Sequence, residues 1–184
     1  SVSAWSMERT FGSQDGKMVV TVSDGQGSPV YTVSYNNEIF IQESPLGLKT
    51  NIGDYTQGMT MKSGQSDVKL IKEHYELSNI KQSKVDYLAN EAVCVFEKEG
   101  KAIYEVIFRV SNRDVAFKYR MYPQRETRSC IVFGEATGFQ LPQGTTTFLC
   151  PQVKPMGGFA RTYPSYETPY SVDEAMGKNG WGEG

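Results

Sequence analysis

Residues 102–122 read AIYEVIFRVSNRDVAFKYRMY, and this stretch decides the fold class of the 184-residue chain. Apolar side chains fall at every second position of both halves, and the polar run 111–114 separates the halves. Side chains of a strand point alternately to opposite faces, so this period of two predicts an antiparallel strand pair with one buried face. The inward positions are Tyr104, Val106, Phe108 and Val110 in the first half and Val115, Phe117, Tyr119 and Met121 in the second.

Further strand signals lie upstream of this pair. An apolar run at 93–97 reaches it through the turn 98–101, so three consecutive strands form a meander. Runs at 18–22 and 30–35 flank a stretch of turn formers and predict an opening hairpin. A third run at 39–41 follows two asparagines, which supply the next turn.

Helical signals are weak throughout the chain. No window longer than about ten residues has helical periodicity, so a parallel sheet with crossover helices is disfavoured. Ser171, Glu174 and Gly177 have the spacing of a one-turn helix with a capping box. The glycine-rich segment 51–67 has few aliphatic residues and reads as a long loop. The sequence therefore predicts an all-β, antiparallel fold with at most short helical turns.

Composition excludes several classes of partner. The length is that of about one domain. Nineteen basic and 21 acidic residues give a net charge of -2, which lacks the basic surface that nucleic acids require. Hydrophobic residues make up 39% of the chain, and no apolar run approaches the roughly 18 residues of a membrane span. We expect neither a nucleic-acid partner nor a membrane span.

Few side chains offer catalytic chemistry. The sole histidine, His74, lies in a polar stretch and is expected on the surface or in a turn. A G-x-S-x-G nucleophile motif is absent. Most carboxylates, such as Glu105, fall at outward strand positions or in turns and are expected to be solvated. The cysteines are interpreted either as buried thiols or as a thiol plus a Cys130–Cys150 bridge.

One acidic residue stands apart in the segment 151–184, which is rich in proline, glycine and aromatic residues. Glu167 lies between Pro164 and Pro169 and is flanked by tyrosines. It is either an exposed linker residue or a ligand that needs partners from elsewhere, because calcium takes six to eight oxygen ligands.

Several motifs in order resemble one family. They are the stretch 107–119 with its VAF-x-Y hairpin, the opening 13–17, the segment SPLGL at 44–48 and the tail 163–170. This combination resembles the N-terminal domain of glycoside hydrolase family 97. Arg113 and Asp114 stand where that family usually has Asp-Gly, a difference that affects the turn between the two strands.

The resemblance implies a large antiparallel β-supersandwich of the galactose mutarotase-like kind. It further implies that 1–184 is a single domain whose tail, 151–184, leads to a catalytic (β/α)8 barrel outside this chain. Members of the family are α-glucosidases and α-galactosidases that are secreted or periplasmic and act on α-linked oligosaccharides. On this hypothesis the chain is non-catalytic, packs on its own barrel and supplies Glu167 as a ligand to a calcium ion in the active site.

Two alternatives come from other functional classes. A free-standing carbohydrate-binding β-sandwich would stack sugars on aromatic side chains of the tail, namely Tyr163, Tyr166, Tyr170 and Trp181. An epimerase of the mutarotase kind rests on the fold likeness alone. It is disfavoured because such chemistry needs a general base and general acids, usually including histidine, and the chain offers only His74.

Overall fold

The computed structural model describes residues 6–81, 83–126, 129–146 and 172. The chain divides into two compact units, Ser1–Pro142 and Gln143–Gly184, and the strands of the described residues belong to the first. These elements are antiparallel strands plus one 3-10 turn, η1 (Gly25–Gly27), so the predicted all-β fold is confirmed. The predicted helical turn at 171–177 lies outside the described residues apart from Val172, and so does most of the tail.

The first sheet contains the predicted opening hairpin. Its strand order is β1-β2-β3-β4, and every neighbouring pair is antiparallel. Asn36 and Asn37 both have positive φ, 50° and 66°, which suits the tight turn between the third and fourth strands. The strands are β1 (Glu8–Gly12), β2 (Met18–Ser23), β3 (Val30–Tyr35) and β4 (Glu38–Pro45).

The second sheet contains the predicted meander and runs β11-β10-β9-β7, with β8 also paired to β9. Val106 lies opposite Tyr119 and Phe108 opposite Phe117, which is the register that the alternating pattern predicts. The strands are β7 (Thr60–Met61), β8 (Val68–Glu76), β9 (Lys84–Lys98), β10 (Lys101–Ser111) and β11 (Val115–Met121). A smaller sheet joins β12 (Val132–Glu135), β5 (Leu48–Thr50) and β6 (Gly53–Asp54).

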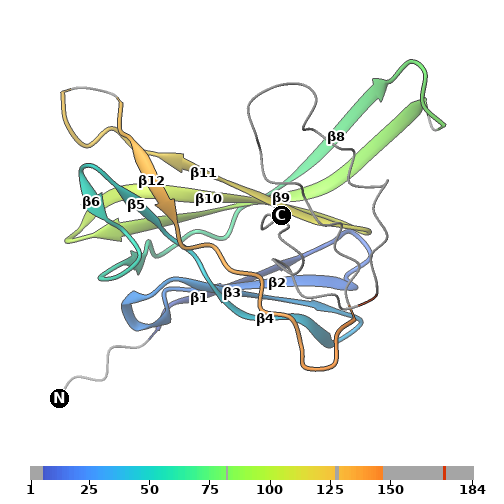
Figure 1. The fold of residues 1–184 in the computed structure, drawn as a ribbon. Helices are drawn as coiled ribbons and strands as arrows, with labels where there is room; N and C mark the ends of the chain where they lie inside the picture. Colours follow the sequence, from blue (N-terminus) through green and yellow to red (C-terminus); the bar gives the residue numbers. More distant parts are fainter. Residues whose placement is uncertain (1–5, 82, 127–128, 147–171, 173–184) are drawn as a thin grey trace, which may run out of the picture. The chain divides into compact units, whose positions relative to one another are not determined.

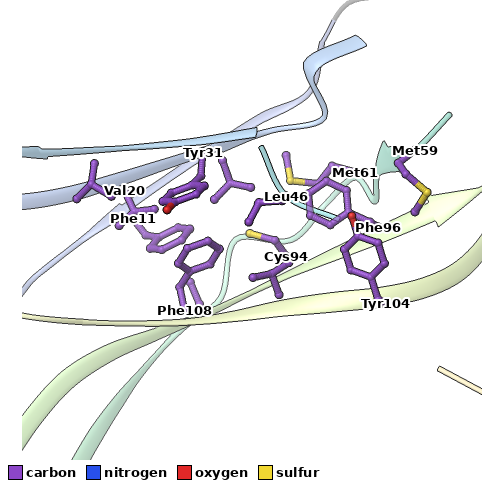
Figure 2. Packing of buried hydrophobic residues seen from close by; sticks show 14 of the residues in the cluster. Phe11, Val20, Tyr31, Leu46, Met59, Met61, Cys94, Phe96, Tyr104 and Phe108 are labelled. Atoms are coloured by element: carbon purple, nitrogen blue, oxygen red, sulfur yellow. The ribbon is translucent and has the colours of Figure 1, made fainter. Parts of the chain in front are cut away.

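The two larger sheets bury one aromatic core between them. Phe108 of β10 lies 5.5 Å from Phe11 of β1, 6.1 Å from Tyr31 of β3 and 5.1 Å from Phe117 of β11, measured between ring centroids. Figure 2 shows Phe11 and Tyr31 pointing from one sheet toward Phe108 on the other. Aromatic pairs at these separations add to the free energy of burying their area. The sandwich therefore depends on the inward face of β10.

The segment 51–67 differs from the predicted loop because its large side chains enter the core. Tyr55, Met59 and Met61 are buried there, and Figure 2 shows both methionines beside the aromatic cluster. Gly47, at φ 142°, permits this approach, since a Cβ atom there would lie 2.9 Å from the backbone of Thr56. Aliphatic alternation cannot reveal such a segment, because methionine and tyrosine fill irregular gaps without a period.

The β8–β9 hairpin extends past the neighbouring strands (Figure 1). Strand β9 begins at Lys84, earlier than the predicted start at residue 93, and β8 occupies the stretch that holds His74. Strand β10 ends at Ser111 opposite Ala89, so residues 84–88 of β9 pair with β8 on one side only among the described residues. The protruding half of this hairpin therefore presents a free strand edge.

Substitution of Phe108 by alanine tests the aromatic core. Phe108 is 0% exposed, and we expect the variant to lose about 3–5 kcal/mol of unfolding free energy because it leaves a cavity between the sheets. Urea denaturation followed by tyrosine fluorescence measures this loss. Phe133→Ala is the matched control, since Phe133 is 68% exposed and its removal should change stability by no more than about 0.5 kcal/mol. Equal losses in the two variants would contradict the account.

Candidate functional site

The predicted site residue, Glu167, lies outside the described residues. The tail aromatics Tyr163, Tyr166, Tyr170 and Trp181 lie outside them too. Within the described part of the chain, no group of three or more histidine, cysteine or acidic side chains is arranged to hold a metal ion. No helix in that part has the length and apolar character needed to cross a bilayer. Candidate chemistry within 6–142 therefore rests on other side chains, most of them on the second sheet.

Glu105 is buried, and its prediction as a solvated carboxylate is wrong. Its side chain is 2% exposed on the face of β10 that points away from the aromatic core. The guanidinium of Arg120, directly opposite on β11, forms an ion pair with one carboxylate oxygen. The hydroxyl of Tyr122 donates a hydrogen bond to the other oxygen. The ion pair with Arg120 and the hydrogen bond from Tyr122 both run from β10 to β11 or to the residue after it, so this carboxylate stabilises the pairing of the two strands.

A second ionic cluster joins three strands on this same face. Arg109 donates from Nε to Glu91 and from Nη1 to Glu73, each at 2.9 Å. The hydrogen bond to Glu91 raises the pKa of Arg109, while burial acts in the opposite direction and the charge of Glu73 adds to the rise. The cluster therefore ties β8 and β9 to β10 where the protruding part of the hairpin begins.

The opposite face of the hairpin carries exposed ion pairs. His74 Nδ1 lies 2.6 Å from a carboxylate oxygen of Asp86, and Lys84 lies 3.3 Å from Glu76. The side chain of His74 is more than half exposed, which confirms the predicted surface histidine. Pairs as exposed as these add little stability. They mark this face of the hairpin as the solvated one.

The other hairpin face carries two tyrosines, and residues of both faces along the edge of β9 border a hollow of about 580 Å³. Tyr75 lies opposite Val85 and Glu73 lies opposite Tyr87, so both tyrosines point to the face that also carries Arg109. The hollow lies between the free edge of β9 and the turn that joins β10 to β11. Its lining residues are Tyr75, Lys84, Val85, Asp86, Tyr87, Leu88, Ser111, Asn112, Arg113 and Asp114.

Hydrogen bonds hold the turn beside this hollow in one conformation. The hydroxyl oxygen of Ser111 accepts hydrogen bonds from the backbone N–H groups of Arg113 and Asp114, both at 3.0 Å. The side-chain oxygen of Asn112 accepts one from the backbone of Asp15. Burial, followed by the charge of Asp114, raises the pKa of Tyr87. These hydrogen bonds therefore fix the turn that forms one side of the hollow.

The cysteines of the described residues are free thiols. Cys94 lies in the core, and burial raises its pKa to about 11, so its thiol is protonated at neutral pH. Cys130 is partly exposed. Cys150 lies outside the described residues, and the alternative of a Cys130–Cys150 bridge stays a prediction.

The burial of Glu105 could have been predicted from the sequence by considering the residue that pairs with it on the next strand. Alternation places Glu105 on the outward face, as observed, but outward does not mean solvated when a strand is central in its sheet. The same register places Arg120 directly opposite and Tyr122 two residues further on the same face. An acid that faces an arginine across a central strand pair could have been read as a buried ion pair.

Removal of the arginine partner tests the role of Glu105. Arg120 is 65% exposed, so Arg120→Met disturbs little packing. It leaves the carboxylate of Glu105, which is 2% exposed, without its ion-pair partner. We expect a loss of roughly 3 kcal/mol of unfolding free energy at pH 7, because an unpaired buried charge is costly. Glu105→Gln in the same background should recover part of that loss. A loss below about 0.5 kcal/mol in Arg120→Met, measured by urea denaturation, would show that water already solvates this carboxylate.

Comparison with known proteins identifies relatives. The family described as "Glycosyl-hydrolase 97 N-terminal" matches residues 11–180. A probable retaining alpha-galactosidase of Streptomyces bingchenggensis (strain BCW-1) is 27% identical over 143 residues, which are 78% of this chain and 22% of that protein. The crystal structure of a beta-arabinopyranosidase has 42% identity and a TM-score of 0.74, covering 86% of this chain and 25% of that one.

A more distant structure shows the fold alone. It is a glycoside hydrolase family 97 enzyme from Pseudoalteromonas sp. strain K8 in complex with acarbose, with 21% identity and a TM-score of 0.67. The alignment covers 79% of this chain and 23% of that one. This chain thus spans about a quarter of the length of the relatives described, at 22% to 25% of each. Since the family match runs from residue 11 to residue 180, this chain belongs to the N-terminal domain family of glycoside hydrolase family 97.

Proposed function

We propose that this chain is the non-catalytic N-terminal domain of a secreted or periplasmic glycoside hydrolase and that it packs on a catalytic (β/α)8 barrel. The observation that carries the proposal is the match of 11–180 to an N-terminal domain family, together with relatives of which the matched part of this chain covers only 22% to 25%. A glycosidase needs two carboxyl groups about 5–5.5 Å apart when one is the nucleophile, or about 6.5–9.5 Å apart when water attacks directly. On this proposal the barrel supplies that pair.

The names of the relatives favour one class of substrate. One is a probable retaining alpha-galactosidase and another is a beta-arabinopyranosidase, which at 42% identity is nearer in sequence than the acarbose complex. A β-L-arabinopyranose ring has the hydroxyl arrangement of α-D-galactopyranose and lacks only the exocyclic CH2OH group. For the L-sugar, the two names describe the same ring stereochemistry. We place α-galactosides and β-L-arabinopyranosides first among the substrates of the full-length enzyme and α-glucosides second.

On this proposal Glu167 is a calcium ligand in the active site of the full-length enzyme. A carboxylate is the kind of oxygen donor that calcium prefers, and one such donor needs at least five more oxygen ligands. The described residues offer no cluster of three acids to complete the set, so the remaining ligands would come from the barrel and from water. The domain would then help to complete the active site while carrying no reacting group of its own.

Calcium dependence of the full-length enzyme tests this role. Activity on p-nitrophenyl α-galactoside and p-nitrophenyl β-L-arabinopyranoside is measured against free calcium for the natural protein and for Glu167→Gln. The variant has lost a charged ligand, so we expect its half-activating calcium concentration to rise at least tenfold. Glu99→Gln, which changes an exposed turn residue, is the control and should reproduce the natural curve.

Three outcomes would contradict parts of the proposal. Superimposable calcium curves for Glu167→Gln and the natural enzyme would remove Glu167 from the site. Turnover by the 184-residue chain alone, at the rate of the full-length enzyme, would show that the domain is itself catalytic. Turnover of p-nitrophenyl α-glucoside in preference to the other two substrates would overturn the order of substrates.

A further inference from the structure

The hollow beside the β8–β9 hairpin has the dimensions and lining of a small-ligand site. Its volume of about 580 Å³ falls within the range of about 300–1,000 Å³ that is usual for ligand pockets. The hairpin forms one wall with two tyrosines, two aliphatic residues and the charged pair Lys84 and Asp86, and the polar turn at 111–114 forms the other. We propose that this hollow is an accessory subsite for a neutral, pyranose-containing oligosaccharide. The proposal rests on this hollow and not on the hydrolase activity proposed above.

Two tyrosines supply a flat apolar surface. Tyr75 and Tyr87 share one face of the hairpin and are diagonal neighbours, because Tyr75 pairs with Val85 and Tyr87 lies two residues beyond. Diagonal positions in an antiparallel pair lie about 7–8 Å apart, within reach of aromatic side chains. The C–H face of a pyranose ring matches such a surface, while the tyrosine hydroxyls remain available to polar groups.

The polar wall supplies directed hydrogen bonds. Asp114 offers carboxylate acceptors beside the hydroxyl of Tyr87, and Asn112 carries an amide whose oxygen already accepts from Asp15. Asn112 lines the hollow, and its amide nitrogen is a hydrogen-bond donor that the bond to Asp15 does not use. Ser111 fixes the backbone of this turn through two hydrogen bonds, so ligand binding would cost little conformational entropy in the turn. Sugar hydroxyls both donate and accept, so a mixed set of acceptors and donors suits them.

The charge of the hollow disfavours ionic ligands. Two acids, Asp86 and Asp114, are balanced by two bases, Lys84 and Arg113. Asp86 is further engaged with His74 on the solvated face. A phosphate or nucleotide would favour a surplus of cationic donors, and a divalent cation would favour a surplus of carboxylates. A neutral polyhydroxylated ligand needs neither.

The test is a titration of the 184-residue chain with panose and, separately, with α-1,6-galactobiose, followed by amide chemical shifts. We expect saturable shifts at residues 84–88 and 111–114. Tyr75 is 42% exposed, so Tyr75→Ala should leave the fold intact while raising the dissociation constant at least tenfold. Phe133→Ala removes an exposed aromatic ring on β12, outside the hollow, and should bind as the natural chain does.

A second variant separates the polar role from the aromatic one. Tyr87→Phe keeps the ring but removes a hydroxyl that lines the hollow and could hydrogen-bond to a sugar, so a dissociation constant several-fold higher is expected. The proposal is overturned if neither sugar gives saturable shifts at these residues, if Tyr75→Ala binds as well as the natural chain, or if shifts concentrate at the tail tyrosines instead. Any of these results leaves the activity and calcium tests of the hydrolase proposal unaffected, because those use the full-length enzyme and other residues.

Discussion

Strand β10 is central in its sheet, and the constraint on its two faces governs the rest of the structure. Its inward face places Phe108 against Phe11 and Tyr31, which joins the two larger sheets. Its outward face carries Glu105, a buried carboxylate held by Arg120 and Tyr122. A strand that is buried on both faces cannot shift its register by one residue without exchanging an aromatic core for a charged layer. This double requirement fixes the position of both neighbouring strands.

The same meander creates the functional surfaces. Because β9 is longer than β10, its first residues run past the end of the sheet and carry β8 with them. The Arg109 cluster holds the base of this hairpin, and beyond it the two faces differ, one with ion pairs and the other with tyrosines. The hollow lies where the aromatic face meets the turn at 111–114. A difference in strand length is therefore the origin of the hollow.

The sequence predicted the parts of the fold that a local pattern controls. Period-two alternation located β10 and β11 with their register, and asparagines and glycines located the turns at 36–37 and 98–101. Residues 51–67 were missed because Tyr55, Met59 and Met61 fill the core without a period. The early start of β9 was missed because its apolar residues fall on both faces, with Val85 and Tyr87 on one and Leu88 on the other. The hollow depends on contacts between residues far apart in the chain, which local patterns do not report. The predicted site residue Glu167 lies outside the described residues, so its role stays a prediction.

Native-state hydrogen exchange of the 184-residue chain tests most directly whether β10 is the element on which the sandwich depends. Residues 104–110 are paired with β9 on one side and with β11 on the other, so their amides should exchange only through global unfolding. Amides of the protruding hairpin, 72–76 and 84–88, should exchange through local opening, with an exchange free energy well below the unfolding value. Protection of the hairpin equal to that of β10, or early exchange at 104–110, would contradict the account.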